Sequence, residues 1–307
     1  DGVMSTRTFA ADTPTPALAL AEGKTLTAQA GQTAAMKTDY ENRTTSIKES
    51  VVSISKNAGG ELSLTVNGKT YDFDAADKGF DSDGVTYYSY NVDGDEDADG
   101  NPRYIVLVSN NGSINDIVNG ESTKVVYLAK YLDITDDIEA GVSNGEQGWF
   151  VVGSETQAAA LGEFTTKSYS GRLGGEALDS EGFSTVGTRV EFRSNDLTLT
   201  ANFEANTISG TAGNLSLRQR VRGEAVPDYV EVDGAFLFQD GAINGADFSG
   251  NLSFDDTFKN SVGTESVGAS FSGSFFGAEG EAVGGVIKGT TTDVDGISTI
   301  TGAFTSD

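Results

Sequence analysis

The sequence has no histidine and no cysteine among its 307 residues, and only 4 prolines and 1 tryptophan. Without histidine, the chain lacks the general base of Ser-His-Asp and Cys-His enzymes and every zinc or haem site that needs imidazole. Without cysteine, it lacks thiolate chemistry, iron–sulfur clusters and disulfide bonds. These absences favour a binding or structural protein over an enzyme.

Positive charge is also scarce, because 20 Lys and Arg residues stand against 46 Asp and Glu residues, a net charge of −26. This acidity excludes nucleic acids and anionic membranes as general partners. No run approaches about 18 consecutive apolar residues, so no membrane-spanning helix is predicted. The chain begins at Asp1, so we expect that any signal peptide has been removed and that a lipid anchor would lie on an upstream cysteine. Acidity and 39 glycines are typical of a bacterial surface protein, either secreted or anchored to the outer membrane.

Apolar and polar residues alternate in segments of about five to ten residues, the pattern of antiparallel strands. Asn-Gly and Asp-Gly pairs between such segments predict tight hairpins at Asn67-Gly68, Asn111-Gly112, Asp240-Gly241 and Asp295-Gly296. Helical periodicity is scarce, and its best candidates are Glu155–Leu161 and, more weakly, Leu18–Ala35. The sequence therefore predicts an all-β protein.

The composition changes near residue 160. Eight of the 10 tyrosines lie before Thr156, whereas glycine and phenylalanine dominate from Phe164 onward. Regular short strands with glycine at the corners suit a small up-and-down barrel, because glycine permits bends and aromatic rings fill the interior. We predict a β-rich domain over residues 1–156 and an eight-stranded antiparallel β-barrel over residues 157–307.

Three linked motifs carry a family resemblance. They are Trp149–Thr156 followed by Tyr169–Gly175, then Leu199–Gly210, and finally Gly273–Val286 followed by Gly302-Ala303-Phe304. In this order they resemble the barrel domain of the transferrin-binding-protein-B-like surface lipoproteins, over roughly residues 149–307. The sequence departs from the family pattern at Asn202, Ala278 and Ala282, and residues 1–148 carry no matching motif.

The resemblance implies a β-rich handle domain before the barrel. It also implies a non-catalytic surface protein that captures an iron source, either haem or a metal-carrying protein, for a TonB-dependent outer-membrane receptor. The signature residues of the barrel are Gly273, Phe275, Phe276, Gly277, Gly284 and Gly285. Because Phe275 and Phe276 alternate along one strand, one ring can enter the barrel while the other packs outside. We interpret the signature as a device that closes the barrel rather than as a ligand site.

Tyr87, Tyr88 and Tyr90 are candidate ligand-binding residues. In a chain without histidine, tyrosinate is the remaining good ligand for ferric haem. The simpler interpretation is a strand whose tyrosine rings cover a sheet while their hydroxyl groups reach water. The same two interpretations apply to Tyr127, Tyr131 and Tyr169.

Alternating carboxylates at Asp93, Asp95, Asp97 and Asp99 suggest a calcium loop. The EF-hand register fails, because Ala98 stands at the sixth position and Tyr104 at the twelfth. A solvated acidic hairpin loop is the simpler interpretation. Haem and calcium therefore remain the two candidate ligands, and neither is established by the pattern.

Arg218, Arg220 and Arg222 alternate along one predicted strand, so they line one face of it. Such a basic stripe could bind an anionic ligand or an acidic partner. Alternatively, the arginines balance local charge or protect an edge strand. Trp149 and Phe150 are expected in the core of the domain junction rather than at an exposed contact site.

Enzyme signatures are missing. Gly141–Gly145 has the Gly-x-Ser-x-Gly pattern, but the chain has no histidine that could serve as its base. Ser53–Lys56, which has the Ser-x-x-Lys pattern, lies in a predicted strand that turns Ser53 and Lys56 to opposite faces. A hydrolase with two carboxylates is a third hypothesis, but nothing singles out a pair among the 46 acids. The predicted function is thus iron capture at the cell surface, and the alternative is a structural or adhesive surface module without a small-molecule ligand.

Overall fold

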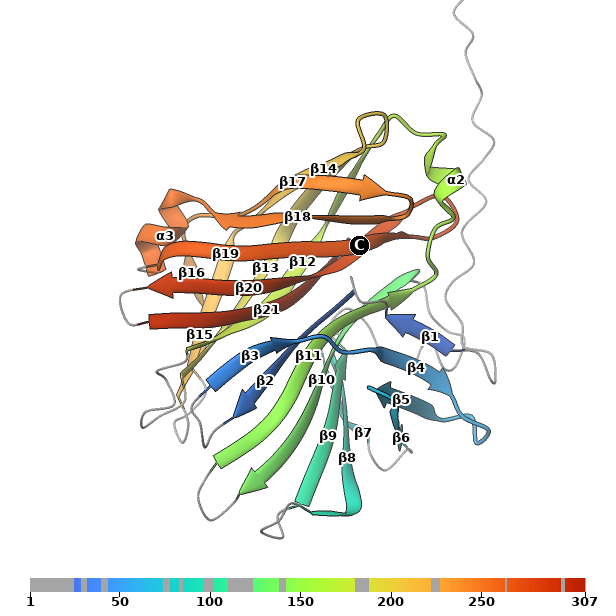
Figure 1. Cartoon of the computed structure of the whole chain (residues 1–307), viewed down its shortest axis with the longest axis vertical. Coiled ribbons are helices and arrows are strands. Elements are labelled where there is room, and N and C mark those ends of the chain that lie inside the picture. Colours follow the sequence, from blue (N-terminus) through green and yellow to red (C-terminus); the bar gives the residue numbers. More distant parts are fainter. Residues whose placement is uncertain are drawn as a thin grey trace, which may run out of the picture.

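The computed structural model describes residues 25–28, 32–39, 44–73, 78–82, 85–96, 102–109, 124–137, 142–179, 188–221, 227–262, 264–293 and 296–306. These residues form three antiparallel sheets, two in the first half of the chain and one in the second (Figure 1). The prediction of an all-β fold is confirmed. Within the described residues, no helix has the length and apolar character needed to cross a membrane.

We call the two sheets of the first half, whose strands lie between Thr25 and Gly153, the handle. The smaller handle sheet has four strands in the order β1-β4-β5-β6. These are β1 (Thr25–Ala28), β4 (Val52–Lys56), β5 (Leu62–Val66) and β6 (Lys69–Phe73). β5 and β6 join through Asn67 and Gly68, whose φ angles are 51° and 84°. Positive φ at both positions is what a type I′ turn requires, so this hairpin is as predicted.

The larger handle sheet has seven strands in the order β3-β2-β11-β10-β9-β8-β7. These are β2 (Thr33–Asp39), β3 (Thr44–Lys48), β7 (Lys78–Ser82), β8 (Val85–Glu96), β9 (Pro102–Ser109), β10 (Val126–Asp137) and β11 (Val142–Gly153). One face packs on the smaller sheet around a core that includes Ile54, Leu64, Phe73, Leu107 and Phe150. The alternation of apolar side chains along these strands therefore produces a two-layered handle.

The barrel sheet consists of ten strand segments. They are β12 (Thr166–Asp179), β13 (Thr188–Asn202), β14 (Thr207–Gly213), β15 (Leu215–Val221), β16 (Val230–Val232), β17 (Phe236–Asn244), β18 (Asp247–Phe254), β19 (Thr264–Phe276), β20 (Ala282–Asp293) and β21 (Gly296–Ser306). β12 pairs with both β13 and β21, which closes the sheet. β14 and β15 follow one another along a single edge of β13, and β16 and β17 follow one another along the next strand position, so ten segments make eight strands. The result is the closed eight-stranded antiparallel barrel that the sequence predicts.

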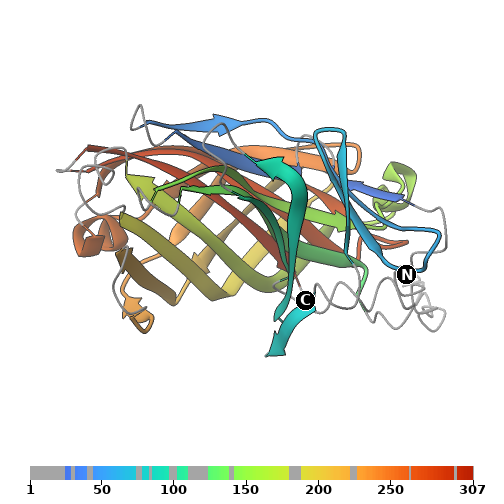
Figure 2. The same cartoon turned by 90° about the horizontal axis from the view of Figure 1, so that it is seen from below.

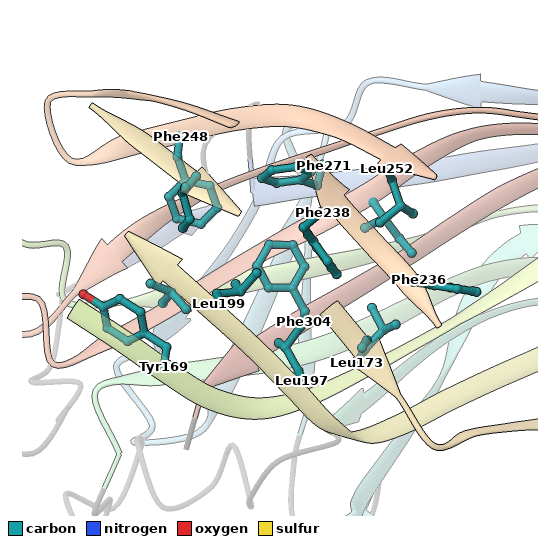
Figure 3. Close-up of a cluster of buried hydrophobic side chains, with 14 of the residues drawn as sticks. Tyr169, Leu173, Leu197, Leu199, Phe236, Phe238, Phe248, Leu252, Phe271 and Phe304 are labelled. Carbon is teal, nitrogen blue, oxygen red and sulfur yellow. The ribbon is translucent and has the colours of Figure 1, made fainter. Parts of the chain in front are cut away.

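Phenylalanine rings fill the barrel. The ring centroids of Phe238 lie 5.0 Å from Phe271 and 5.2 Å from Phe304, in edge-to-face contacts. Phe248 contacts Phe275 at 5.2 Å in the same way. In Figure 3 the labelled side chains come from strands on several sides and meet in the middle of the barrel. The interior is thus an aromatic core.

Two sequence predictions are corrected by the described residues. Asp240 and Gly241 lie inside β17, where the pairing with β18 shifts between Gln239 and Ala242, so they form a bulge rather than a hairpin. The β17–β18 turn instead lies between Asn244 and Asp247. The described part of Leu18–Ala35 forms strands rather than a helix, because β1 alternates exposed threonines with buried Leu26 and Ala28.

Among the described residues, two short helices flank the barrel strands (Figure 1). α2 (Ala158–Leu161) lies within the segment predicted to be helical. α3 (Asp256–Val262) has no counterpart among the sequence predictions. Phe258 of α3 packs edge-on against Phe236 and Phe254, so the helix covers the aromatic core where β18 ends.

The second face of the larger handle sheet packs on the outer wall of the barrel. Figure 2 shows β10 and β11, in green, lying across the red barrel strands. A small apolar cluster joins them and contains Ala34, Val126, Leu128, Trp149, Val151, Phe276, Ala282, Val286 and Ala303. Trp149 is therefore buried at the domain junction. Phe275 enters the barrel core while Phe276 belongs to the junction, as opposite faces of one strand require.

Candidate functional site

The segment that links the handle to the barrel is fixed to the end of β19. Thr156 donates its backbone N–H to the carbonyl of Phe275 (2.9 Å), and Gly277 donates to the carbonyl of Ser154 (2.7 Å). The Thr156 hydroxyl group also donates to the carbonyl of Gly277 at 2.8 Å. The first and last family motifs, far apart in sequence, are therefore in direct contact.

The turn after β19 receives further hydrogen bonds from β12. Gly277 and Gly280 have φ angles of 94° and 66°, values that L side chains rarely adopt. The Tyr169 hydroxyl group donates to the carbonyl of Gly280 at 2.9 Å, and Lys167 Nζ donates to the carbonyl of Glu279 at 2.7 Å. Burial raises the pKa of Tyr169, so its phenol stays protonated as a donor. The motif residues hold the turn and the linker in place.

The other signature glycines lie in strands. Gly273 of β19 pairs with Gly285 of β20, and a Cβ at Gly285 would lie 2.3 Å from the Ser272 carbonyl oxygen and 2.6 Å from the Phe304 ring. The missing side chain of Gly285 thus makes room for the Phe304 ring, and that of Gly273 makes room for the Phe248 ring. Gly284 points the other way, toward Val126 of the handle. These contacts support barrel closure and domain packing as the role of the signature.

The tyrosine and aspartate candidates of the handle are placed only by their backbone. Tyr87, Tyr88 and Tyr90 lie in β8, where Tyr88 pairs with Leu107 and Tyr90 with Ile105. Their side chains lie outside the described part of the chain.

The acidic segment begins in a strand rather than in the predicted loop. Asp93 and Asp95 belong to the end of β8, where the pairing with β9 becomes irregular between Val92 and Glu96. Asp97 and Asp99 lie outside the described residues. Within the part of the chain that is described, no group of three or more acidic side chains could hold a metal ion.

The other tyrosine candidates are buried in the core. Tyr127, Tyr131 and Tyr169 are each 5% exposed or less. Tyr131 donates its hydroxyl group to Glu146 Oε1 at 2.6 Å, and Glu146 also accepts from Ser50 and pairs with Lys48. Burial opposes the ionisation of Glu146, but the hydrogen bonds from Lys48, Ser50 and Tyr131 outweigh it and lower its carboxyl pKa. Tyr131 is therefore a neutral donor to a carboxylate.

This arrangement predicts a loss of stability in alkali. Burial and the bond to Glu146 raise the pKa of Tyr131 well above the unfolded value of about 10. The contribution of Tyr131 to the free energy of unfolding is complete below pH 10. It is lost as the pH rises above 10, by about 1.4 kcal/mol per pH unit. In urea unfolding between pH 8 and 11.5, Tyr131→Phe should be less stable than the parent at pH 8, and the difference should shrink above pH 10. If the free energies of unfolding of the two proteins changed in parallel with pH, folding would not raise the pKa of Tyr131.

Arg218 is committed to an internal ion pair. Its guanidinium group binds Glu191, with Nε 3.0 Å from Oε2 and a shorter contact through the terminal nitrogen. The backbone of Arg220 pairs with Arg189, and the Arg220 side chain lies outside the described part, as does all of Arg222. Of the interpretations given for Arg218, the structure supports local charge balance.

Glu191 is the middle of a charged row across the barrel wall. It lies opposite Arg218 on one side and opposite Glu176 on the other. Two glutamates facing each other repel, so cations must compensate them. Arg189 bridges both carboxylates, at 2.8 Å from Glu176 and 2.6 Å from Glu191.

Lys130 of the handle completes this row at the domain junction. Its Nζ lies 2.5 Å from Glu176 Oε1 and 5.4 Å from the centre of the Trp149 ring, and Glu176 is 1% exposed. Burial lowers the pKa of Lys130 to about 8 despite the charge of Glu176. For Glu176, burial opposes ionisation, but the charges of Lys130 and Arg189 outweigh it and lower the carboxyl pKa. We call Lys130, Glu176, Arg189, Glu191 and Arg218 the junction ladder.

The outer end of the junction ladder carries an aromatic ring between two arginines. The Tyr229 ring centre lies 4.3 Å from the Arg218 guanidinium carbon and 3.8 Å from that of Arg193. Sequence reasoning singled out Arg218 alone in this group. Lys130, Glu176 and Tyr229 carried no signal beyond a polar or aromatic position in a strand pattern, because their partners come from distant segments.

Comparison with known proteins finds relatives only in structure, since no protein-family model and no curated protein matches the chain. It is similar to a crystal structure of transferrin-binding protein B from Haemophilus parasuis Hp5, at 15% identity and a TM-score of 0.46, over 90% of this chain and 44% of that one. It is also similar to the isotype 1 transferrin-binding protein B from serogroup B Neisseria meningitidis, at 14% identity and a TM-score of 0.39, over 90% of this chain and 43% of that one. The chain spans less than half the length of these proteins. The chain is thus similar in fold to these structures, and its own described residues form two sheets followed by a closed eight-stranded barrel.

Proposed function

We propose that this chain is a non-catalytic, cell-surface binding protein that captures an iron-carrying protein and presents it to an outer-membrane receptor. The three barrel motifs support the proposal, because they resemble those of a family of such surface proteins. The first and the last of them are in contact at the linker and the β19 turn. The absence of histidine and cysteine removes most catalytic and metal-binding chemistry.

The observation that carries the choice of a protein ligand is the filled barrel. Phe238, Phe248, Phe271 and Phe304 occupy the interior, and each is buried. Small ligands of β-barrels bind inside a lumen, whereas a plugged barrel offers only its outer surface and its loops. An external surface on rigid sheets suits a macromolecular ligand.

The buried tyrosines argue against haem as the ligand. Tyr131 and Tyr169 use their hydroxyl groups in hydrogen bonds to Glu146 and Gly280, and burial raises the pKa of each phenol. A tyrosinate ligand needs the opposite, an accessible phenol with a lowered pKa. Tyr87, Tyr88 and Tyr90 remain the haem candidates of the chain.

Two parallel measurements on the purified protein test the proposal. We expect it to bind an iron-loaded transferrin in surface plasmon resonance more tightly than the same transferrin without iron. We also expect that hemin titration causes no Soret shift. A Soret shift without transferrin binding would replace the carrier protein with haem. If neither ligand bound, the proposal would fail and the structural or adhesive module would stand.

A further inference from the structure

The barrel sheet has one open edge in the described part of the chain. β16 pairs with β15 on one side and with no described strand on the other. β17, which continues the same strand position, pairs by contrast with β14 on one side and with β18 on the other. The outer edge of β16 therefore presents backbone groups that an added strand can bind.

The side chains of this edge are apolar on one face and acidic on the other. Val230 is 65% exposed, the most exposed large hydrophobic side chain in the described part of the chain. Glu231 and Asp233 are exposed, and neither forms an ion pair with any described residue. Because successive residues of a strand alternate between faces, Val230 and Glu231 would contact different faces of an added strand.

Tyr229 holds the start of this edge in place. Its hydroxyl group lies 3.3 Å from Glu191 Oε2, and its ring packs against Arg193 and Arg218. Because Arg218 belongs to the junction ladder, this contact anchors the start of β16 to the barrel wall. A preorganised edge loses less conformational entropy on binding than a mobile one.

We infer that the outer edge of β16 binds an extended segment of a partner protein in which basic residues alternate with apolar ones. The basic residues would lie beside Glu231 and Asp233, and the apolar residues beside Val230. Cross-strand pairs of opposite charge stabilise such an addition. The net charge of −26 would also speed the approach of a basic segment. This inference goes beyond iron capture and does not depend on which cargo the protein binds.

The probe is a synthetic peptide of alternating lysine and valine, measured by fluorescence anisotropy with the full chain. We expect saturable binding that weakens at higher salt. Glu231→Lys should weaken it about tenfold or more, since like charges then face each other. The matched control is Glu163→Lys, an exposed glutamate beside α2, at the other end of the barrel from β16 (Figure 1). This control should bind the peptide like the parent.

A second peptide separates strand addition from general charge attraction. It has the same sequence but is N-methylated at alternate residues, so its charge is unchanged while the amides that would pair with β16 cannot donate. We expect no saturable binding of this peptide. Equal binding of both peptides, equal effects of the two Glu→Lys changes, or no binding of the unmodified peptide would each overturn the inference.

Discussion

Replacing Lys130 with methionine is expected to lower the free energy of unfolding by about 3 kcal/mol. The cause is Glu176, which is 1% exposed and would lose the cation 2.5 Å away that comes from the handle. Arg189 would remain as its only partner in the junction ladder and must also serve Glu191. Removing one member of a buried pair leaves a charge that burial penalises, and this costs far more than the pair contributes.

The position of Trp149 makes this prediction easy to measure. It is the only tryptophan of the chain, and Lys130 lies over its ring, so its fluorescence reports on the junction itself. Guanidinium unfolding at pH 7 should show an earlier transition for Lys130→Met. Lys37→Met, a change at an exposed lysine of β2, is the matched control and should leave the midpoint nearly unchanged.

The double variant Lys130→Met with Glu176→Leu tests the cause. Replacing both charges with apolar groups removes the uncompensated carboxylate, so most of the lost stability should return. Arg189 would keep Glu191 as its partner. If the double variant were as unstable as Lys130→Met alone, the loss would arise from altered packing around Trp149 and not from a buried charge.

Replacing Gly285 with alanine is expected to destabilise the barrel by about 2–3 kcal/mol. The added Cβ would lie 2.3 Å from the Ser272 carbonyl oxygen, 2.6 Å from the Phe304 ring and 2.9 Å from Gly273 Cα. Two of these neighbours are backbone atoms of the paired strand, which cannot move without breaking the β19–β20 pairing. The clash therefore displaces Phe304 or separates the strands.

Gly268→Ala supplies the control for this change. Gly268 lies on the adjacent strand, is exposed, and a Cβ there would meet nothing closer than 3.7 Å. Because alanine restricts the unfolded chain more than glycine, this variant should match or slightly exceed the parent in stability. Urea unfolding of both variants is the measurement. Equal midpoints for the two variants would contradict the close approach of β19, β20 and Phe304.

Local sequence patterns predict the elements of this protein where the determining interactions are also local. Asn67-Gly68 forms a type I′ turn because the two residues themselves accept positive φ. Asp240-Gly241 has the same kind of sequence but forms a bulge. There, a Cβ at Gly241 would lie 2.2 Å from the carbonyl oxygen of Ile208 on β14, a contact that no local pattern contains.

In the candidate site, too, some features follow from the local sequence and others depend on how distant strands pair. The alternation of Phe275 and Phe276 is sufficient to predict that one ring enters the barrel and the other leaves it. Arg218 pairs with Glu191 inside the chain because the register between β13 and β15 places the two residues opposite each other. The local sequence of β15 does not contain this information. A shift of one residue would turn these side chains to opposite faces of the sheet.

By itself, the sequence determined the all-β class, the aromatic barrel interior and the lack of histidine and cysteine chemistry. These follow from residue type and from the alternation of apolar and polar residues along strands, both of which depend on only a few neighbouring residues. Only the tertiary structure decided that Lys130 meets Glu176, that Thr156 binds the β19 turn, and that β16 pairs with a single strand among the described residues. Each of these depends on strand register and sheet closure, which bring together residues that are far apart in the chain.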